Sequence, residues 1–412
     1  MSARPEPEAR WLAELREQGL EAFAALPMPT SKEEVWRYVD LDFDLADLSM
    51  PEKAGTPLGE GRFTVAGIGG ARIVDGFVDD IVQPDGVTIT PTSEADPAAL
   101  EAAAASVIPP DLDKFSAAHH GFGTDGLLVH AGKGVAVDGP IVIDVQAVTP
   151  NALSLPRILL VAEAQSDLSV IVVYRSPDEG TFYVVPQLQA TVGDAARLRL
   201  TTVQAWGYGT VSVGQQRTVL GRDASVHHGE AGIGAGLGRL HFFVDIDGAG
   251  AHSEISGLYF GEDDQLLDYR AFINHRAPNT TSNMFLKGAV EDASHSVFTG
   301  LIRIEEEAQR VNAFQTNRNL VLSDEAGAES VPNLEILAND VKCGHGSTVG
   351  PLDAEQRYYL MSRGLDRIHA DRLQVRGFFE EAIGKLPHQE MAAAIRRAVN
   401  EKYVRAQEEG RL

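Results

Sequence analysis

The chain of 412 residues contains one cysteine, Cys343, and comparatively few residues of positive charge. A single cysteine excludes an internal disulfide and is typical of proteins in a reducing cytosol. Lys and Arg number 35 against 59 Asp and Glu, so the formal net charge is −24. This charge argues against nucleic acid and against anionic membranes as partners, because both attract clustered basic residues.

Long apolar runs are also missing. No stretch approaches the roughly 18 apolar residues of a transmembrane helix. The first residues, "MSARPEPEARWLAELREQG", lack the apolar centre of a secretory signal. We therefore expect a cytoplasmic protein. A phosphate-binding loop is absent as well, because "GIGAGLG" at Gly232 to Gly238 lacks the GK[ST] ending, so we expect no nucleotide to be bound by this chain itself.

Short β-rich runs, such as "RILLVAEAQSDLSVIVVY", dominate from about Gly126 to Val349, with no convincing long helix between them. Turn-like segments recur around Ala195, Ala224, Ala249 and Ala293, which lie 29, 25 and 44 residues apart, the last gap being near two coils. This period favours a stacked β-solenoid over residues 126–350. A β-sandwich of short strands is the alternative.

Helical segments flank the β region on both sides. Residues 1–60 form an N-terminal helical region with one helix from about Glu6 to Leu26, and residues 61–125 form a mixed segment that leads into the β region. Residues 351–412 form a C-terminal domain of three helices. The first of these helices begins after a capping Asp353 and ends at Gly364.

Apolar residues form a stripe on the C-terminal helices. Met391, Ile395 and Val399 step by four along one helix face, and Phe378 and Phe379 precede them. Two interpretations stay open for these five residues. They pack on their own domain, or they form a surface for a partner protein.

The segment "NDVKCGHGSTVG", Asn339 to Gly350, contains the one cysteine and a histidine two residues later. On a strand, Cys343 and His345 point to the same face, so both could reach one metal ion. Two ligands are too few for a closed zinc site or an iron–sulfur cluster, which need about four. A metal site, a nucleophile with its base, and a tight turn with a buried cysteine remain open as interpretations.

Longer motifs resemble a known family. The segment "AQRVNAFQTNRNLVLSDEAGAESVPNLEILANDVKCGHGSTVGPLDAEQRYYLMSRG" resembles the C-terminal core of the SufB/SufD family of iron–sulfur cluster assembly proteins. "DGLLVHAGKGVAVDGPIVI" and "NHRAPNTTSNMFLKGAVEDASHSVFTGLIRI" are similar to further parts of that core. "SKEEVWRYVDL" resembles the N-terminal motif of the SufD branch, which the single cysteine also favours.

The resemblance implies a right-handed parallel β-helix between an N-terminal helical region and a C-terminal helical domain. It implies a non-catalytic subunit of a SufBCD-type scaffold complex, which pairs with a SufB-like paralogue. A SufC-type ATPase would dock on the C-terminal helical domain. By the same resemblance, His345 would be a ligand of a nascent iron–sulfur cluster shared with a cysteine of the SufB-like partner, and Cys343 would be a second candidate ligand.

Two other functions stay open. One is a SufB-like scaffold that forms a homodimer, with Cys343 supplied by each chain; whether the chain forms a homodimer when it is alone stays open as well. The other is a β-solenoid carbohydrate-active enzyme with paired carboxylates along a groove. Such enzymes usually carry a secretion signal, and no carboxylate pair can be placed in a cleft from this sequence.

Overall fold

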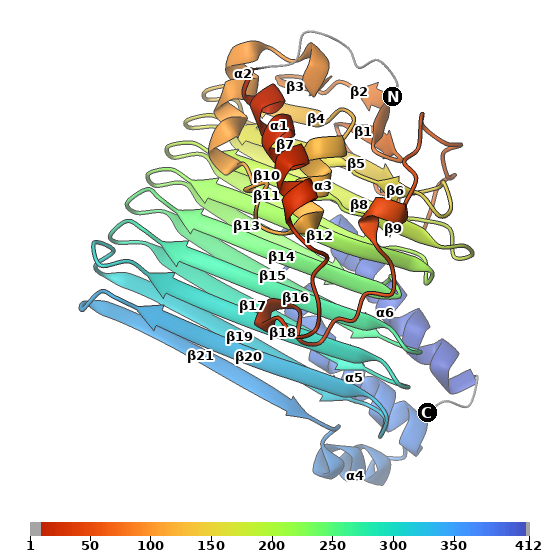
Figure 1. Cartoon of the computed structure of the whole chain (residues 1–412). Coiled ribbons are helices and arrows are strands. Elements are labelled where there is room, and N and C mark those ends of the chain that lie inside the picture. The colour runs from red at the N-terminus through yellow and green to blue at the C-terminus, as the bar shows by residue number, and fades with distance from the viewer. Residues whose placement is uncertain (1–9, 409–412) are drawn as a thin grey trace.

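The computed structural model describes residues 10–408, with side chains as far as residue 402, and its core is a two-sheeted β-solenoid (Figure 1). This confirms the predicted solenoid. Each turn contributes one strand to a 10-stranded sheet and one to an 11-stranded sheet. The first sheet contains, in order, β2 (Phe77–Val82), β1 (Gly69–Val74), β5 (Ile141–Gln146), β8 (Asp167–Arg175), β11 (Arg197–Ala205), β13 (Ser225–Gly232), β15 (His252–Gly261), β17 (Thr281–Val290), β19 (Val311–Val321) and β21 (Val341–Gly350).

The 11-stranded sheet faces the first one across the core. It contains β20 (Gly327–Ile336), β18 (His295–Ile304), β16 (Leu266–His275), β14 (Leu237–Ile246), β12 (Thr210–Leu220), β10 (Gln187–Val192), β7 (Arg157–Ala162), β4 (Leu127–Ala131) and β3 (Val87–Pro91), with the short β6 (Leu153–Ser154) and β9 (Phe182–Val184) beside this path. Nearly all pairs are parallel; β1 with β2 and β3 with β4 are antiparallel. The sheets therefore begin at Gly69, upstream of residue 126.

The register gives the true length of a turn. Arg197 pairs with Ser225, which pairs with His252, so successive turns are 28 and 27 residues long. Ala249 precedes β15 of one sheet, whereas Ala293 precedes β18 of the other sheet. The 44-residue gap between them is therefore about one and a half turns, and the predicted two coils are wrong. The alanine pattern marks the turns of both sheets.

Several tight turns between strands contain a residue in the left-handed backbone conformation, which explains why small and acidic residues recur there. Gln165, Ala195, Asp223, Asp263 and Asp292 have φ angles of 64°, 55°, 55°, 55° and 56°. Asp and Asn adopt this region more readily than other side chains do. The strands between these turns are apolar on both faces, as in β8, because one face fills the interior of the solenoid and the other is covered by helices.

The N-terminal helices cover the outer face of the 11-stranded sheet (Figure 1). Trp36 is buried, its ring stacks on Phe115 at 5.3 Å, and the Arg239 guanidinium lies 3.9 Å above it. Arg239 is also ion-paired with the buried Asp268, so the segment around Trp36 is fixed on the sheet.

The helices of the N-terminal region are α1 (Arg10–Ala25), α2 (Pro97–Ala102), α3 (Lys114–Phe122), and the short 3-10 helices η1 (Glu34–Trp36), η2 (Leu45–Asp47), η3 (Thr92–Glu94) and η4 (Ala103–Ser106).

Three C-terminal helices follow β21, as predicted: α4 (Ala354–Ser362), α5 (Arg367–Ile383) and α6 (Gln389–Glu408). The Asp353 side chain accepts hydrogen bonds from the first turn of α4, and Gly364 has a φ of 98° just after that helix. Helices α5 and α6 pack on the outer face of the 10-stranded sheet, opposite the N-terminal helices (Figure 1). Within residues 10–408, no helix is long and apolar enough to cross a membrane.

Candidate functional site

The two ends of the solenoid differ. At the N-terminal end, antiparallel strands and helices cover the first turns. At the other end the 10-stranded sheet stops at β21 and the 11-stranded sheet stops at β20, so their outer edges pair with no strand in the described part of the chain. Large apolar side chains are exposed on or near this end: Phe314, Val331, Ile336, Leu337 and Val349. We call this surface the open end.

Cys343 and His345 both lie on β21 at the open end. Cys343 pairs in register with Ala313, and His345 pairs with Gln315. Ala313 and Gln315 are buried, because their row of alternate residues faces the interior of the solenoid. Cys343 packs against an apolar cluster of that interior, whereas His345 is exposed. The two side chains therefore share the inner face of the last strand.

The inner face beside His345 is polar. The Ser347 hydroxyl donates to Ser330 Oγ across the two sheets at 2.7 Å, and Ser330 donates to Asn317 Oδ1 at 2.8 Å. Asn317 in turn donates to the Tyr259 hydroxyl at 3.0 Å. A chain of hydrogen bonds thus extends from Ser347 on β21 to Tyr259 on β15, three turns into the core, and it orders the side chains beside His345.

Metal binding by this chain alone has little support from its geometry. Within residues 10–408, no group of three or more His, Cys, Asp and Glu side chains is gathered closely enough to hold an ion. Burial raises the pKa of the Cys343 thiol, which favours the protonated form over the thiolate that binds metals. Among the described side chains, Cys343 and His345 can therefore supply at most part of a metal site.

The apolar stripe of the C-terminal helices is not available to a partner. Phe379, Met391 and Ile395 are fully buried and Val399 is 3% exposed; together they form one cluster with the outer face of the 10-stranded sheet. Phe378 packs partly against the same cluster. The assignment to partner binding is therefore corrected for Phe379, Met391, Ile395 and Val399, which cover this chain's own sheet. Phe378 is only partly buried and also lines a surface cleft, so for this residue the assignment stays a prediction.

The exposed apolar residues of the C-terminal domain lie elsewhere. Helix α4 has no buried residue, and Tyr358 and Tyr359 on it are 76% and 60% exposed. Met361 on α4, with Ile368 and Leu373 on α5, are also exposed. Sequence reasoning missed these residues as a surface. The absence of a single apolar face on "AEQRYYLMS" is the signal that could have shown that α4 does not pack on the core.

Buried polar contacts fix α5 and α6 on the sheet. The His388 ring lies between the hydroxyls of Ser169 and Thr201, 2.8 Å from each. The Lys287 ammonium donates to the Phe378 carbonyl at 2.7 Å and pairs with Glu381 at 2.7 Å. Burying such groups is costly unless they are paired, so these contacts specify one position of the helices.

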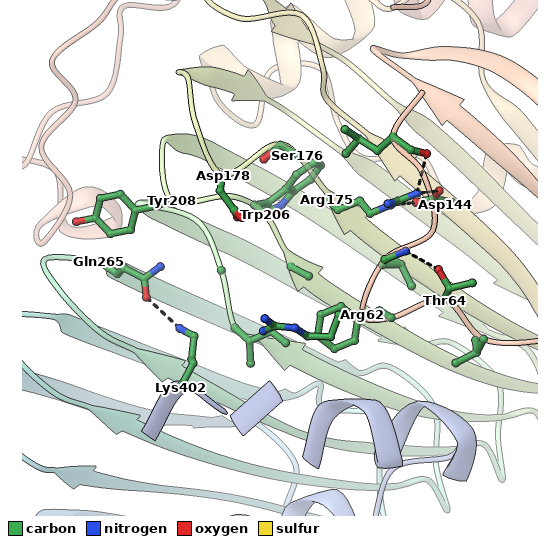
Figure 2. A pocket seen from close by; sticks show the side chains of 18 of the residues that line it. Arg62, Thr64, Asp144, Arg175, Ser176, Asp178, Trp206, Tyr208, Gln265 and Lys402 are labelled. Atoms are coloured by element: carbon green, nitrogen blue, oxygen red, sulfur yellow. Dashed lines mark hydrogen bonds and ion pairs between the residues drawn. The ribbon is translucent and has the colours of Figure 1, made fainter. Parts of the chain in front are cut away.

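A cavity of about 590 Å³ lies where residues 58–65, the ends of several strands and α6 meet (Figure 2). On one side, Arg175 binds Asp144 through two hydrogen bonds of 2.7 and 2.6 Å. On another side, Lys402 of α6 lies 3.2 Å from Glu262. Arg175 also donates to the Gly59 carbonyl at 2.6 Å, so it holds the N-terminal segment against the solenoid as Lys402 holds α6. We therefore interpret the cavity as a structural junction.

A carboxyl group is buried in the interior of the solenoid. Glu230 on β13 is 1% exposed and accepts a hydrogen bond from the Thr202 hydroxyl. The ring Nε2 of His228 is 2.8 Å from the same hydroxyl. Burial raises the pKa of Glu230 to about 8 and lowers the pKa of His228 to about 3. Both groups are therefore neutral in the folded chain near pH 7.

Comparisons with known proteins agree on one family. The family model described as "SUF system FeS cluster assembly, SufBD core domain" matches residues 145–378. An iron–sulfur cluster assembly SufBD family protein of Mycobacterium tuberculosis is 34% identical over 66% of this chain and 70% of its own length. The iron–sulfur cluster assembly protein SufD of Bacillus subtilis is 28% identical over 67% and 64%. The chloroplastic protein ABCI7 of Arabidopsis thaliana is 26% identical over 92% and 84%.

Proposed function

Because the chain belongs to the SufB/SufD family of iron–sulfur cluster assembly proteins, we propose that it is a non-catalytic, SufD-like subunit of a cluster assembly complex. It pairs with a SufB-like paralogue through the open end. It binds a SufC-type ATPase through its C-terminal helices. The nascent cluster is the cargo of this complex and is held between the two paralogues.

The open end is the observation that carries this proposal. An uncovered strand edge with exposed apolar residues is a liability in a soluble protein and is usually covered. Repeat proteins cap their last turn for the same reason. A partner of the same fold supplies a matching cap, because its own last strand offers the same pattern of donors and acceptors.

Pairing about a two-fold axis would bring His345 next to the partner. His345 and Gly346 are the two central residues of the ten-residue strand β21. If two related last strands pair antiparallel, their central residues lie opposite one another. His345 would then face the matching segment of the SufB-like chain, so a cysteine of that segment could complete the ligand set that this chain lacks.

The charge of the C-terminal domain supports a docking role. Residues 351–412 contain 11 of the 35 Lys and Arg but only 10 of the 59 Asp and Glu. This segment is nearly neutral in a chain of net charge −24, so it repels a typical protein surface less than the rest of the molecule does. Together with the exposed Tyr358 and Tyr359, it is the best candidate for ATPase docking, since tyrosines are enriched at interfaces.

Co-expression tests this proposal and its nearest alternative. The chain is co-expressed with a SufB-like paralogue and a SufC-type ATPase, and the purified complex is analysed for stoichiometry and for iron and sulfide. We expect one copy of this chain with one SufB-like chain and the ATPase. A second copy of this chain at the open end, with the SufB-like chain excluded, would instead support the homodimeric scaffold.

A further inference from the structure

Gln315 is the buried neighbour of His345, and the carbonyl oxygen of its side chain lacks a hydrogen bond. The two residues are paired in register on β19 and β21, and both side chains belong to the inner row of the 10-stranded sheet. Gln315 is 1% exposed, and within the described part of the chain its Oε1 atom accepts no hydrogen bond. A buried acceptor without a partner is costly, so a donor is expected to reach this oxygen.

The rest of the Gln315 amide is fixed. Its Nε2 donates to the Asn333 carbonyl on β20 at 3.1 Å, and this bond also decides which end of the amide is the oxygen. Oε1 lies over Gly300 on β18, where a Cβ would collide with it. The fold itself therefore holds the amide in one orientation, and glycine at position 300 leaves the space for it.

Other donors near the open end are already used. Ser347 donates to Ser330 at 2.7 Å, and the Asn333 side chain donates to a carbonyl of its own strand at 3.3 Å. The His345 ring, in contrast, makes no hydrogen bond within the described chain. Adjacent strands of a sheet lie about 4.8 Å apart, so the ring of a histidine in register with Gln315 can reach Oε1.

We propose that Gln315 is a positioning residue for His345: its Oε1 accepts the N–H of one ring nitrogen, so that the other ring nitrogen keeps its lone pair and faces the open end. This inference rests on the proposed function, in which that second nitrogen binds the nascent cluster. A neutral imidazole carries one N–H and one lone pair, and the acceptor of the N–H decides which nitrogen is which. Outer partners of this kind orient histidine ligands at metal sites generally.

A fixed ring matters most where the remaining ligands come from another chain. A histidine side chain at a strand edge samples several rotamers and both neutral tautomers, and ordering them opposes the completion of a ligand set. With Gln315 holding the ring, His345 is ordered before the SufB-like chain arrives. Gln315 thus gives this half of the site its geometry without touching the cluster.

The tautomer of His345 is the direct readout, and it can be measured in the isolated full-length chain. Protein with ¹⁵N-labelled histidine is studied by NMR at about pH 8, where imidazole rings in water are neutral, and His345→Ala assigns the signal. We expect one tautomer in the unmodified chain. Gln315→Met keeps the length of the side chain but removes the acceptor, so both tautomers should appear, a change of about fivefold or more in their ratio.

Gly300→Ala and Gln309→Met are the matched variants. A methyl group at Gly300 displaces the Gln315 amide without changing the glutamine, so it should mix the tautomers as Gln315→Met does. Gln309 accepts a hydrogen bond from the Asp340 backbone at 2.9 Å. Gln309→Met therefore also removes a contact between a glutamine and the last turn, yet the tautomer of His345 should stay unchanged. The melting temperature of each variant is recorded.

The outcomes separate Gln315 from the wider proposal. A mixture of tautomers in the unmodified chain, or an unchanged tautomer in a stable Gln315→Met, overturns the inference and leaves His345 as a proposed ligand. If Gln315→Met melts lower than the unmodified chain, Gly300→Ala decides in the same way.

The iron and sulfide content of the co-expressed complex tests the link to the cluster. If the tautomer depends on Gln315 but the complex holds no iron or sulfide, the positioning stands and the proposed function fails. In a complex that holds a cluster, Gln315→Met should weaken the retention of iron about tenfold or more, as the loss of an outer partner of a histidine ligand does elsewhere, whereas Gln309→Met should not. Full retention in Gln315→Met would overturn the role of this position in cluster binding.

Discussion

Gln315 and His345 are neighbours in register on the last two strands of the 10-stranded sheet, yet Gln315 is 1% exposed and His345 is exposed. The two side chains belong to the same inner row, and only the presence of a following strand distinguishes them. Gln315 is covered by the next turn, whereas His345 lies on the turn that has none. A partner chain that added one more strand beside β21 would bury the His345 side chain as well.

The open end should be required for pairing with the SufB-like chain. Val349→Lys places a charge on an apolar residue that is 44% exposed on β21, so the isolated chain should fold normally but lose its partner. Burying an unpaired charge in an interface costs several kcal/mol, roughly a hundredfold or more in affinity. Size-exclusion chromatography with light scattering of the co-expressed proteins measures this loss.

The matched control is Val82→Lys. Val82 is 59% exposed on β2, the edge strand at the opposite end of the same sheet. This variant should pair like the unmodified chain. Loss of pairing in both variants, or in neither, would contradict the assignment of the interface to the open end.

Helix α4 should carry much of the contact with the ATPase. Truncation after Gly364 is a poor test, because it removes α5 and α6 from the sheet and exposes Phe260 and Phe285 beneath them. Tyr358→Ala removes a side chain that packs on nothing in the core, so the melting temperature should stay unchanged. We expect the ATPase to bind about 1–2 kcal/mol more weakly, as measured by calorimetry.

Tyr208→Ala provides the control for this substitution. Tyr208 is 42% exposed and lies in the turn before β12, far from α4 in sequence and in the fold. Its loss should leave the ATPase affinity unchanged. Equal weakening by both variants would point to a nonspecific effect of removing surface tyrosines.

On acidification, the chain should lose stability at pH values above those at which exposed carboxylates become protonated, near pH 4. Burial lowers the pKa of six histidines: His119 well below its usual value, His120, His228 and His241 to about 3, and His275 and His388 to about 4. The unfolded chain binds protons at these sites below about pH 6.5, whereas the folded chain does not. Stability should therefore fall steeply from pH 6.5 toward pH 4, as denaturant titrations at several pH values would show. A flat profile over this range would contradict the neutral burial of these rings.

Glu230 should give the stability of the fold the opposite pH dependence, so that its contribution falls as the pH rises. Because burial raises its pKa to about 8, the folded chain keeps this proton while the unfolded chain loses it above about pH 4.5, so its contribution to stability is lost as the pH rises toward 8. Glu230→Gln removes this dependence. The variant should gain stability over the unmodified chain at pH 8, on the order of 3 kcal/mol, and little at pH 5. An equal change at both pH values would show that only packing had altered.

Much of the fold is readable from local patterns. The recurring turn segments favour the solenoid, and residues in the left-handed conformation do lie in them, as Ala195 and Asp223 show. The pattern does not say which of the two sheets a turn precedes, so the spacing between Ala249 and Ala293 wrongly suggests two coils. That distinction depends on pairing between residues nearly 30 apart.

The candidate site was only partly predictable. The spacing of Cys343 and His345 predicts a shared face, and the register agrees. No local pattern shows that β21 is the last strand, because exposure at the open end comes from the absence of a further turn. Likewise, the stripe at Met391 and Ile395 predicts burial but not the surface that buries it, which is the outer face of the 10-stranded sheet, more than 100 residues earlier in the chain.

The most direct test is the iron and sulfide content of the assembled complex containing His345→Ala. A neutral imidazole is a good ligand for iron, so its loss should leave the shared site one ligand short and sharply lower the cluster content, while complex yield and melting temperature stay unchanged. Cys343→Ser should have a milder effect, because its thiol packs in the interior. Full cluster content in a stable His345→Ala complex would contradict the account and leave the Cys343–His345 segment as the edge of an interface without a role in holding the cluster.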